Sequence, residues 1–157
     1  MMNFVTRLLT RSEPAFSEAR KGDAAAIAAV HAASFQRGWG EDEIHRLIVD
    51  RNVVAHRVTI GQTLSGFILS RLAADEAEIL SIAVAPAWRG RRLARPLLTL
   101  NLRRLAGLGA HSVFLEVGER NAPARRLYDG AGFHEVARRE AYYEGSATAL
   151  VLRRDLS

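Results

Sequence analysis

The sequence contains no cysteine. Disulfide bonds, thiolate metal ligands and a cysteine nucleophile are therefore excluded. Lysine is almost as scarce, because Lys21 is the single lysine among 22 basic residues and the rest are arginines. No apolar stretch approaches the roughly 20 residues that span a bilayer, so no membrane association is expected. The segment 1–12 carries a short apolar run broken by Thr6 and Arg7, which predicts an N-terminal extension and not a signal peptide.

A metal-binding pattern is also missing, because the five histidines show no spacing typical of a metal site. The 157 residues are 48% hydrophobic and 25% charged, an ordinary mix for one globular domain, which we place at 13–157. The net charge of +5 is compatible with nucleic acid, a phosphorylated cofactor or a generic basic surface. No nucleic-acid-binding module is recognisable, so direct nucleic-acid binding is not expected. The missing cysteines are compatible with a cytoplasmic location, which we expect.

The pattern of apolar residues, glycines and prolines predicts one α/β unit. Helices are expected at 24–35, 41–49 and 92–108, and between Asn121 and Gly132. Strands are expected at 15–20, 53–59, 64–72, 76–84, 112–117, 133–138 and 147–152. The short turns between the second, third and fourth strands indicate an antiparallel meander. Asp23 and Asn121 are the predicted N-caps of the first and last helices.

The first segment with chemical content runs from Ile82 to Leu98, where an apolar strand leads into a basic turn and then a helix. Free N–H groups and the positive dipole end at a helix N-terminus favour anions. The turn and the first helical residues add four arginines, which are Arg89, Arg91, Arg92 and Arg95. A diphosphate is a natural ligand for such a turn. The alternative is a solvated basic turn before an ordinary helix.

The second segment is the strand that contains Glu116, which lies between Leu115 and Val117. Burial without a partner raises the pKa of a carboxyl group and suits it to proton transfer. The alternative is a glutamate that faces solvent or pairs with a nearby arginine.

The third segment is the helix that follows Asn121. One face of this helix has small side chains at one end and an aromatic side chain at the other. It is formed by Asn121, Ala124, Leu127, Tyr128 and Ala131. A ligand can lie along such a face, although a lone aromatic residue at this spacing is usually part of the core.

Together these segments resemble the GNAT superfamily of N-acetyltransferases over roughly residues 15–156. The basic turn matches the acetyl-CoA motif Q/R-x-x-G-x-G/A, with Arg89 in its first position and Ala94 in its last. The run from Asn121 through Tyr128 to Phe133 matches the second cofactor segment of that superfamily. The resemblance implies an α/β GNAT fold, with a mixed, mostly antiparallel sheet of about six to seven strands and about four helices.

Within the superfamily the chain is most similar to the bacterial ribosomal-protein-alanine N-acetyltransferases of the RimI type. The residues that carry this similarity are Phe35, Trp39, Asp75-Glu76-Ala77, Leu115-Glu116-Val117, Arg138-Arg139 and Tyr142-Tyr143. The resemblance implies transfer of an acetyl group from acetyl-CoA to a protein N-terminal amine, by direct attack in a ternary complex. A ribosomal protein beginning with alanine is the implied partner.

The resemblance also implies roles for individual residues. Glu116 is the expected general base and Tyr128 the expected general acid. The expected acetyl-CoA-binding residues are Ile82, Ala83, Val84, Arg89, Gly90, Arg91, Arg92, Leu93, Ala94, Asn121 and Tyr128. The expected acceptor-binding residues are Trp39, Glu119, Tyr142 and Tyr143. Glu78 is a rival base, because it lies an even number of residues before Ile82 and is expected on the same face of the strand. The alternative for Trp39 is that its side chain packs in the core beneath its loop.

One departure from the motif is Arg92, which occupies the central glycine position. If that position needs a positive φ, a residue other than glycine costs about 1–2 kcal/mol there. The backbone N–H remains, so anion binding is still expected. Two other functions stay open: an acetyltransferase for a small amine, and a non-catalytic acyl-CoA-binding module.

Overall fold

The computed structural model describes residues 12–141 and 147–156. Within these residues the strands are β1 (Pro14–Glu18), β2 (Val53–Ile60), β3 (Thr63–Ala73), β4 (Glu76–Val84), β5 (Ser112–Gly118), β6 (His134–Arg139) and β7 (Ala149–Asp155). The helices are α2 (Ala24–Ser34), α3 (Glu41–Val49), α4 (Ala94–Gly107) and α5 (Ala122–Gly130), with 3-10 turns η1 (Lys21–Asp23) and η2 (Pro86–Trp88). The predicted order of helices and strands is confirmed.

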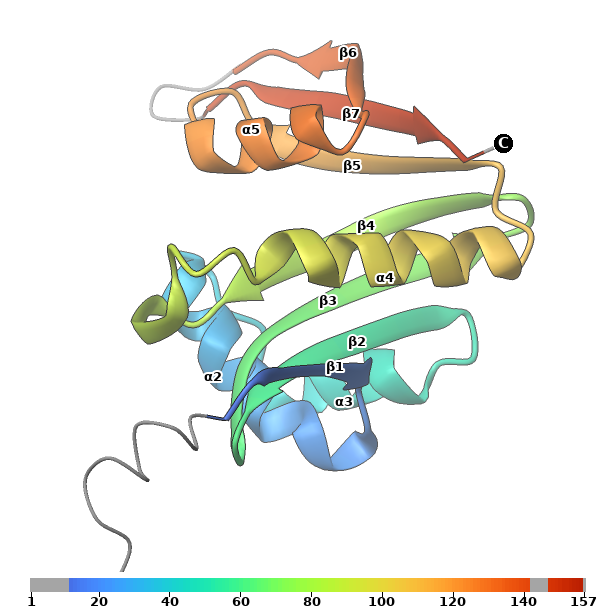
Figure 1. Cartoon of the computed structure of the whole chain (residues 1–157). Coiled ribbons are helices and arrows are strands. Elements are labelled where there is room, and N and C mark those ends of the chain that lie inside the picture. Colours follow the sequence, from blue (N-terminus) through green and yellow to red (C-terminus); the bar gives the residue numbers. More distant parts are fainter. Residues whose placement is uncertain (1–11, 142–146, 157) are drawn as a thin grey trace, which may run out of the picture.

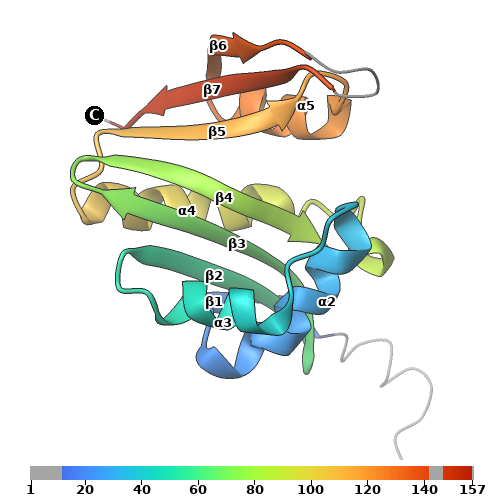
Figure 2. The same ribbon diagram turned by 180° about the vertical axis from the view of Figure 1, so that it is seen from behind.

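The strands form one seven-stranded sheet in the order β1-β2-β3-β4-β5-β7-β6. Helices α4 and α5 cover one face and α2 and α3 cover the other, as the two opposite views show (Figures 1 and 2). Successive side chains of a strand point to opposite faces, so β3 contributes side chains to two apolar clusters. Ile68 packs in the cluster beneath α4 and α5, whereas Phe67 and Leu69 pack in the cluster beneath α2 and α3.

Strands β4 and β5 are the only parallel neighbours in the described sheet. They pair over a short stretch, from Glu76 with Ser112 to Glu78 with Phe114. Beyond that point β4 continues to Val84 on β3, and β5 continues to Gly118 on β7. The two strands therefore end apart from each other inside a continuous sheet.

A β-bulge in β4 changes which side chains face which helices. Leu69 pairs with Ser81, but its neighbour Ser70 pairs with Ile79, so Leu80 is an extra residue. An extra residue reverses the alternation of side chains that follow it. The prediction that Glu78 shares the face of Ile82 is therefore wrong. Glu78 is exposed and lies opposite Arg71 on the face of α2 and α3.

The two predicted helix caps have different outcomes. Asn121 caps α5 as predicted, because its Oδ1 accepts a hydrogen bond from the Ala124 N–H at 3.2 Å. Asp23 precedes α2 without capping it. Its carboxylate instead accepts hydrogen bonds from the Arg20 N–H and from Arg57 Nη1, both at 2.6 Å. Asp23 therefore occupies the predicted N-cap position, but its carboxylate is engaged by Arg57 of β2 and makes no capping hydrogen bond to α2.

Two histidines are buried, and each has its Nδ1 in use as an acceptor. His31 Nδ1 accepts the Trp39 N–H at 3.0 Å, and His56 Nδ1 accepts from Asn101 Nδ2 at 3.0 Å. Burial lowers the pKa of both rings below 6.5, against the opposing charges of Glu43 at His31 and Glu18 at His56. Protonation would also turn Nδ1 of each ring from an acceptor into a donor, and the hydrogen bond that it now accepts would be lost.

We therefore expect the folded protein to lose stability in acid. A lowered folded-state pKa contributes stability that is present above 6.5 and is lost as pH falls below it. The melting temperature should decline between about pH 7.5 and 5.5. The variant His31→Phe keeps an aromatic ring beside Trp39 but cannot titrate, so its decline should be smaller. His45→Gln, at an exposed position on α3, should leave the decline unchanged. An equal decline in His31→Phe and the unmodified protein would contradict this account.

Candidate active site

The separation of β4 and β5 produces a cleft of about 670 Å³. Its lining comes from the end of α2, from β4 and β5, and from α4 and α5. Eight of the predicted site residues line it: Ile82, Ala83, Val84, Arg89, Ala94, Glu116, Asn121 and Tyr128. Segments far apart in the sequence are thus brought together at one place in the sheet.

The cleft is lined by side chains from both faces of the sheet. Ile82 and Tyr128 belong to the cluster beneath α4 and α5. Ala83 packs with the cluster beneath α2 and α3, and Phe35, at the end of α2, lines the cleft from that side. Glu116 also faces that side, because it alternates with residues that pack beneath α4 and α5. A ligand on the α4 and α5 side can therefore meet a second ligand on the α2 side through the gap between the strands.

Tyr128 is the buried polar group on the α5 side of the cleft. It is 6% exposed and packs edge-on against Phe133, with ring centroids 5.7 Å apart. Burial raises the pKa of Tyr128 to about 12. The phenol is therefore protonated at neutral pH and can donate a hydrogen bond to a group in the cleft.

Glu116 has a different environment from the buried one that its apolar neighbours predict. Its side chain is 40% exposed and forms an ion pair with Arg139 at the end of β6. The alternative of an arginine partner is therefore the one the structure favours. Exposed ion pairs contribute about 0–1 kcal/mol, so another cation can displace Arg139 at little cost.

The turn before α4 has the backbone geometry of an anion site. Gly90 has φ of +77° and Arg92 has φ of +58°, and Leu93 follows with φ of −83°. A left-handed residue followed by a right-handed one directs successive N–H groups toward a common point. Arg92, at the motif's central position, thus has a positive φ, the condition under which a residue other than glycine is strained there. The left-handed Arg92 also explains why α4 begins at Ala94 and not at Arg92.

The four arginines around this turn are not equivalent. Arg89 donates to the Val84 carbonyl and to Ser34 Oγ, each at 3.1 Å, and so joins the turn to β4 and α2. Arg95 donates to the Gly130 carbonyl at 2.7 Å and joins α4 to α5. These two side chains brace the cleft.

The other two arginines of the turn face outward. The Arg91 guanidinium lies over the Trp88 ring, 4.9 Å from its centroid. Arg92 is exposed, and its side chain makes no hydrogen bond or ion pair within residues 12–141 and 147–156. Arg92 is thus the cation of this turn that is available to an anionic ligand.

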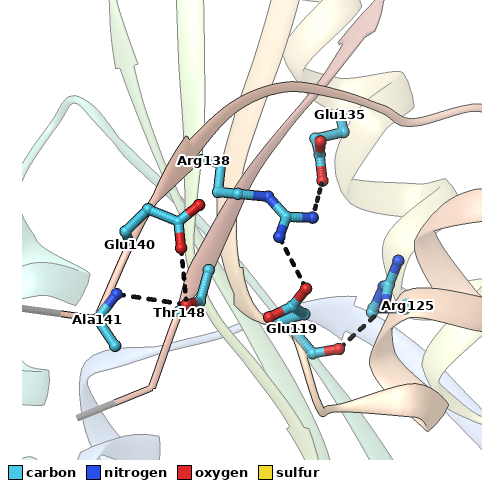
Figure 3. A network of polar contacts seen from close by, with 7 residues as sticks. All are labelled: Glu119, Arg125, Glu135, Arg138, Glu140, Ala141 and Thr148. Carbon is cyan, nitrogen blue, oxygen red and sulfur yellow. Dashed lines mark hydrogen bonds and ion pairs between the residues drawn. The ribbon is translucent and has the colours of Figure 1, made fainter. Parts of the chain in front are cut away.

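Glu119, which is expected to bind the acceptor, forms an ion pair with Arg138 of β6. Arg138 Nη1 donates to the Glu119 carboxylate at 2.8 Å, and Arg125 Nη1 donates to the Glu119 carbonyl at 2.9 Å. Both contacts are drawn in Figure 3. Arg138 also reaches Glu135 at 3.5 Å. These contacts fix the loop that joins β5 to α5, next to the cleft rather than in its lining.

The remaining acceptor-binding predictions concern aromatic residues. Trp39 stacks on His31, with centroids 4.6 Å apart, and packs against the core beneath α2 and α3. It therefore fills the core beneath its loop, which was the alternative to acceptor binding. Tyr142 and Tyr143 lie outside the described residues.

Sequence reasoning missed two residues at this site. Arg139 was noted only as part of a motif, and its pairing with Glu116 spans three strands and has no local signal. Ser81 lines the cleft from β4, and the sequence signal for it is a single hydroxyl between Leu80 and Ile82 in the apolar part of the strand that follows Glu78.

Two further features bear on the ligands. In the described part of the chain, no three His, Asp or Glu side chains are grouped as a metal site. None of the helices described there is long and apolar enough to cross a membrane.

Known proteins share both the sequence and the shape of this chain. Residues 24–133 match the acetyltransferase (GNAT) family. The ribosomal protein bS18-alanine N-acetyltransferase of Salmonella typhimurium is 32% identical over 104 residues, which are 64% of this chain and 70% of that protein. The Haemophilus ducreyi protein of the same description is 32% identical over 87 residues, 55% of this chain and 60% of its own length.

A solved structure agrees with these sequence matches. The crystal structure of the ribosomal-protein-S18-alanine N-acetyltransferase from Escherichia coli superposes with a TM-score of 0.85 at 25% identity. The superposition covers 92% of this chain and 95% of that one. With a family match over more than half of its length and the same fold, the chain belongs to the acetyltransferase (GNAT) family.

Proposed function

We propose that this protein transfers the acetyl group of acetyl-CoA to the N-terminal α-amine of a protein. The observation that carries the proposal is the cleft between β4 and β5, which has the left-handed turn before α4 next to one side and Glu116 on the other. The similarity to ribosomal-protein-alanine N-acetyltransferases supports a ribosomal protein beginning with alanine as the acceptor.

The α4 and α5 side of the cleft suits acetyl-CoA. The left-handed turn at Gly90 and Arg92 offers N–H groups and a free guanidinium to the diphosphate. Beyond Glu78 the edge of β4 has no β5 partner, so its N–H and C=O groups are available to the amides of the pantetheine arm. Bound there, acetyl-CoA supplies an activated acetyl thioester beside Tyr128.

The α2 side of the cleft suits the acceptor. An α-amine has a pKa near ~8, so it arrives largely as an ammonium ion at neutral pH. That cation replaces Arg139 at Glu116, and Glu116 then takes the proton, directly or through water. The free amine attacks the thioester carbonyl, where backbone N–H groups near Ala83 and Val84 bind the developing negative charge.

Tyr128 acts on the leaving group. Thiols have a pKa of about 8.5, well below the value of about 12 for Tyr128, so complete proton transfer to the thiolate is unfavourable. The phenol therefore stabilises the departing sulfur mainly as a hydrogen-bond donor.

The first test is the identity of the acceptor. We expect acetylation of a peptide that begins with alanine, read by mass spectrometry as one added acetyl group. The same peptide with a blocked N-terminus and an internal lysine should stay unmodified, because the proposal places an α-amine at Glu116. Faster reaction with spermidine than with every peptide would instead indicate a small-amine substrate. Binding of acetyl-CoA without acetylation of any amine would indicate a non-catalytic module.

The second test is the base. Glu116→Gln should lower turnover by about 10²- to 10⁴-fold, because it removes the proton acceptor while leaving the cofactor side intact. Its affinity for coenzyme A, measured by calorimetry, should stay within about twofold of the unmodified protein. Matched variants Glu78→Gln and Glu119→Gln should keep most of the turnover, since neither carboxylate lines the cleft. Normal turnover in Glu116→Gln would assign the proton transfer to another group or to solvent.

The third test separates backbone strain from charge at Arg92. Both Arg92→Gly and Arg92→Ala remove the guanidinium, so both should bind coenzyme A a few-fold more weakly, with a smaller loss at high salt. Only glycine relieves the positive φ, and it should be more stable than alanine by about 1 kcal/mol in denaturant unfolding. Equal stability of the two variants would show that φ at this position is not strained.

A further inference from the structure

Ser81 has a buried hydroxyl with no partner. Its residue is 7% exposed, and within residues 12–141 and 147–156 its Oγ is the one buried side-chain polar atom without a hydrogen bond. Other buried serines of the same sheet are satisfied: Ser70 donates to Asn101 Oδ1 at 2.6 Å, and Ser65 donates to the Thr63 carbonyl at 3.2 Å. A buried hydroxyl without a partner costs free energy, so such a group is usually satisfied by an ordered water or by a ligand.

The position of Ser81 indicates which ligand supplies the hydrogen-bond partner of its hydroxyl. Ser81 lines the cleft and lies at the β4 bulge, a feature that commonly redirects a side chain next to an active site. It pairs with Leu69 and so faces the α2 side of the sheet. Glu116 faces the same side, because it alternates with Leu115, which packs beneath α4 and α5.

Ser81 and Glu116 also lie at similar depth in the gap. The last paired residues are Glu78 on β4 and Phe114 on β5. Ser81 follows Glu78 by three residues, one of which is the bulge, and Glu116 follows Phe114 by two. The hydroxyl and the carboxylate therefore flank the gap just beyond the point where the strands separate.

We propose that Ser81 Oγ accepts a hydrogen bond from the acceptor nitrogen and so orients the amine for attack. This inference rests on the proposed function. After Glu116 removes one proton, a primary amine keeps two N–H groups and gains a lone pair. One N–H bound to Ser81 fixes the direction of that lone pair toward the thioester carbonyl. A neutral hydroxyl suits this task because, unlike a second carboxylate, it does not favour the protonated amine.

The test is Ser81→Ala, which removes the hydroxyl at almost constant volume. Because Oγ has no partner in the free protein, we expect a melting temperature equal to or above that of the unmodified protein. Affinity for coenzyme A should be unchanged. Binding of an alanine-initiated peptide to the coenzyme A-loaded protein, measured by calorimetry, should weaken about tenfold, the effect of losing one hydrogen bond. Turnover on that peptide should fall by a similar factor in kcat/KM.

Ser70→Ala is the matched control, because it removes a buried hydroxyl that already has a partner. It should lower the melting temperature and leave peptide binding unchanged, the reverse of Ser81→Ala. Equal peptide binding by Ser81→Ala and the unmodified protein, or a loss of coenzyme A affinity instead, overturns the inference. A lower melting temperature for Ser81→Ala overturns it too, since the hydroxyl would then have a partner within the fold. Failure of the unmodified protein to acetylate any amine overturns only the proposed function, because peptide binding is read without turnover.

Discussion

The cleft depends on the separation of the parallel strands β4 and β5, which part from each other while both remain in the sheet. Strands β4 and β5 share only the pairs from Glu76 with Ser112 to Glu78 with Phe114. Beyond that point each strand keeps its other neighbour: β4 stays paired with β3, and β5 stays paired with β7, both in antiparallel ladders. The cost of the separation is a row of backbone groups without strand partners, and groups of that kind are satisfied by water or by a ligand. A ligand with amide groups and an extended shape is well matched to that edge.

In the proposed function, the same separation places the two substrates on opposite faces of the sheet. Tyr128 of α5 lines the cleft on one face, next to Arg89 and Ala94 at the two ends of the turn before α4, whereas Phe35 at the end of α2 and Glu116 of β5 line it on the other face. Arg89 and Arg95 brace the cleft on both sides, by joining the turn to β4 and α2 and by joining α4 to α5. These contacts connect the elements that line the cleft on either side of the gap.

Local patterns in the sequence predicted the elements and much of the cofactor side. Helical and strand periodicity depends on neighbouring residues, and the acetyl-CoA motif marked Arg92 as a position where a positive φ had to be considered, which the structure has there. The errors arose where distant contacts decide the outcome. The β4 bulge, set by pairing with β3, placed Glu78 on the opposite face from Ile82. The exposure of Glu116 and its arginine partner depend on β6, which comes two strands away in the sheet.

The two groups proposed to handle protons lie in contrasting environments, and the sheet keeps them apart. Tyr128 is enclosed by α5 and Phe133, and burial keeps its phenol protonated far above neutral pH. Glu116 lies at the exposed end of the cleft, paired with a cation that solvent and substrate can both reach. In the proposed mechanism, the proton that leaves the amine therefore departs toward water on the α2 side, and the sulfur is stabilised in the drier setting on the α5 side. Because β4 and β5 separate only beyond Glu78, these two environments meet in the gap between the strands, and the proposed mechanism requires the reacting atoms to come together there.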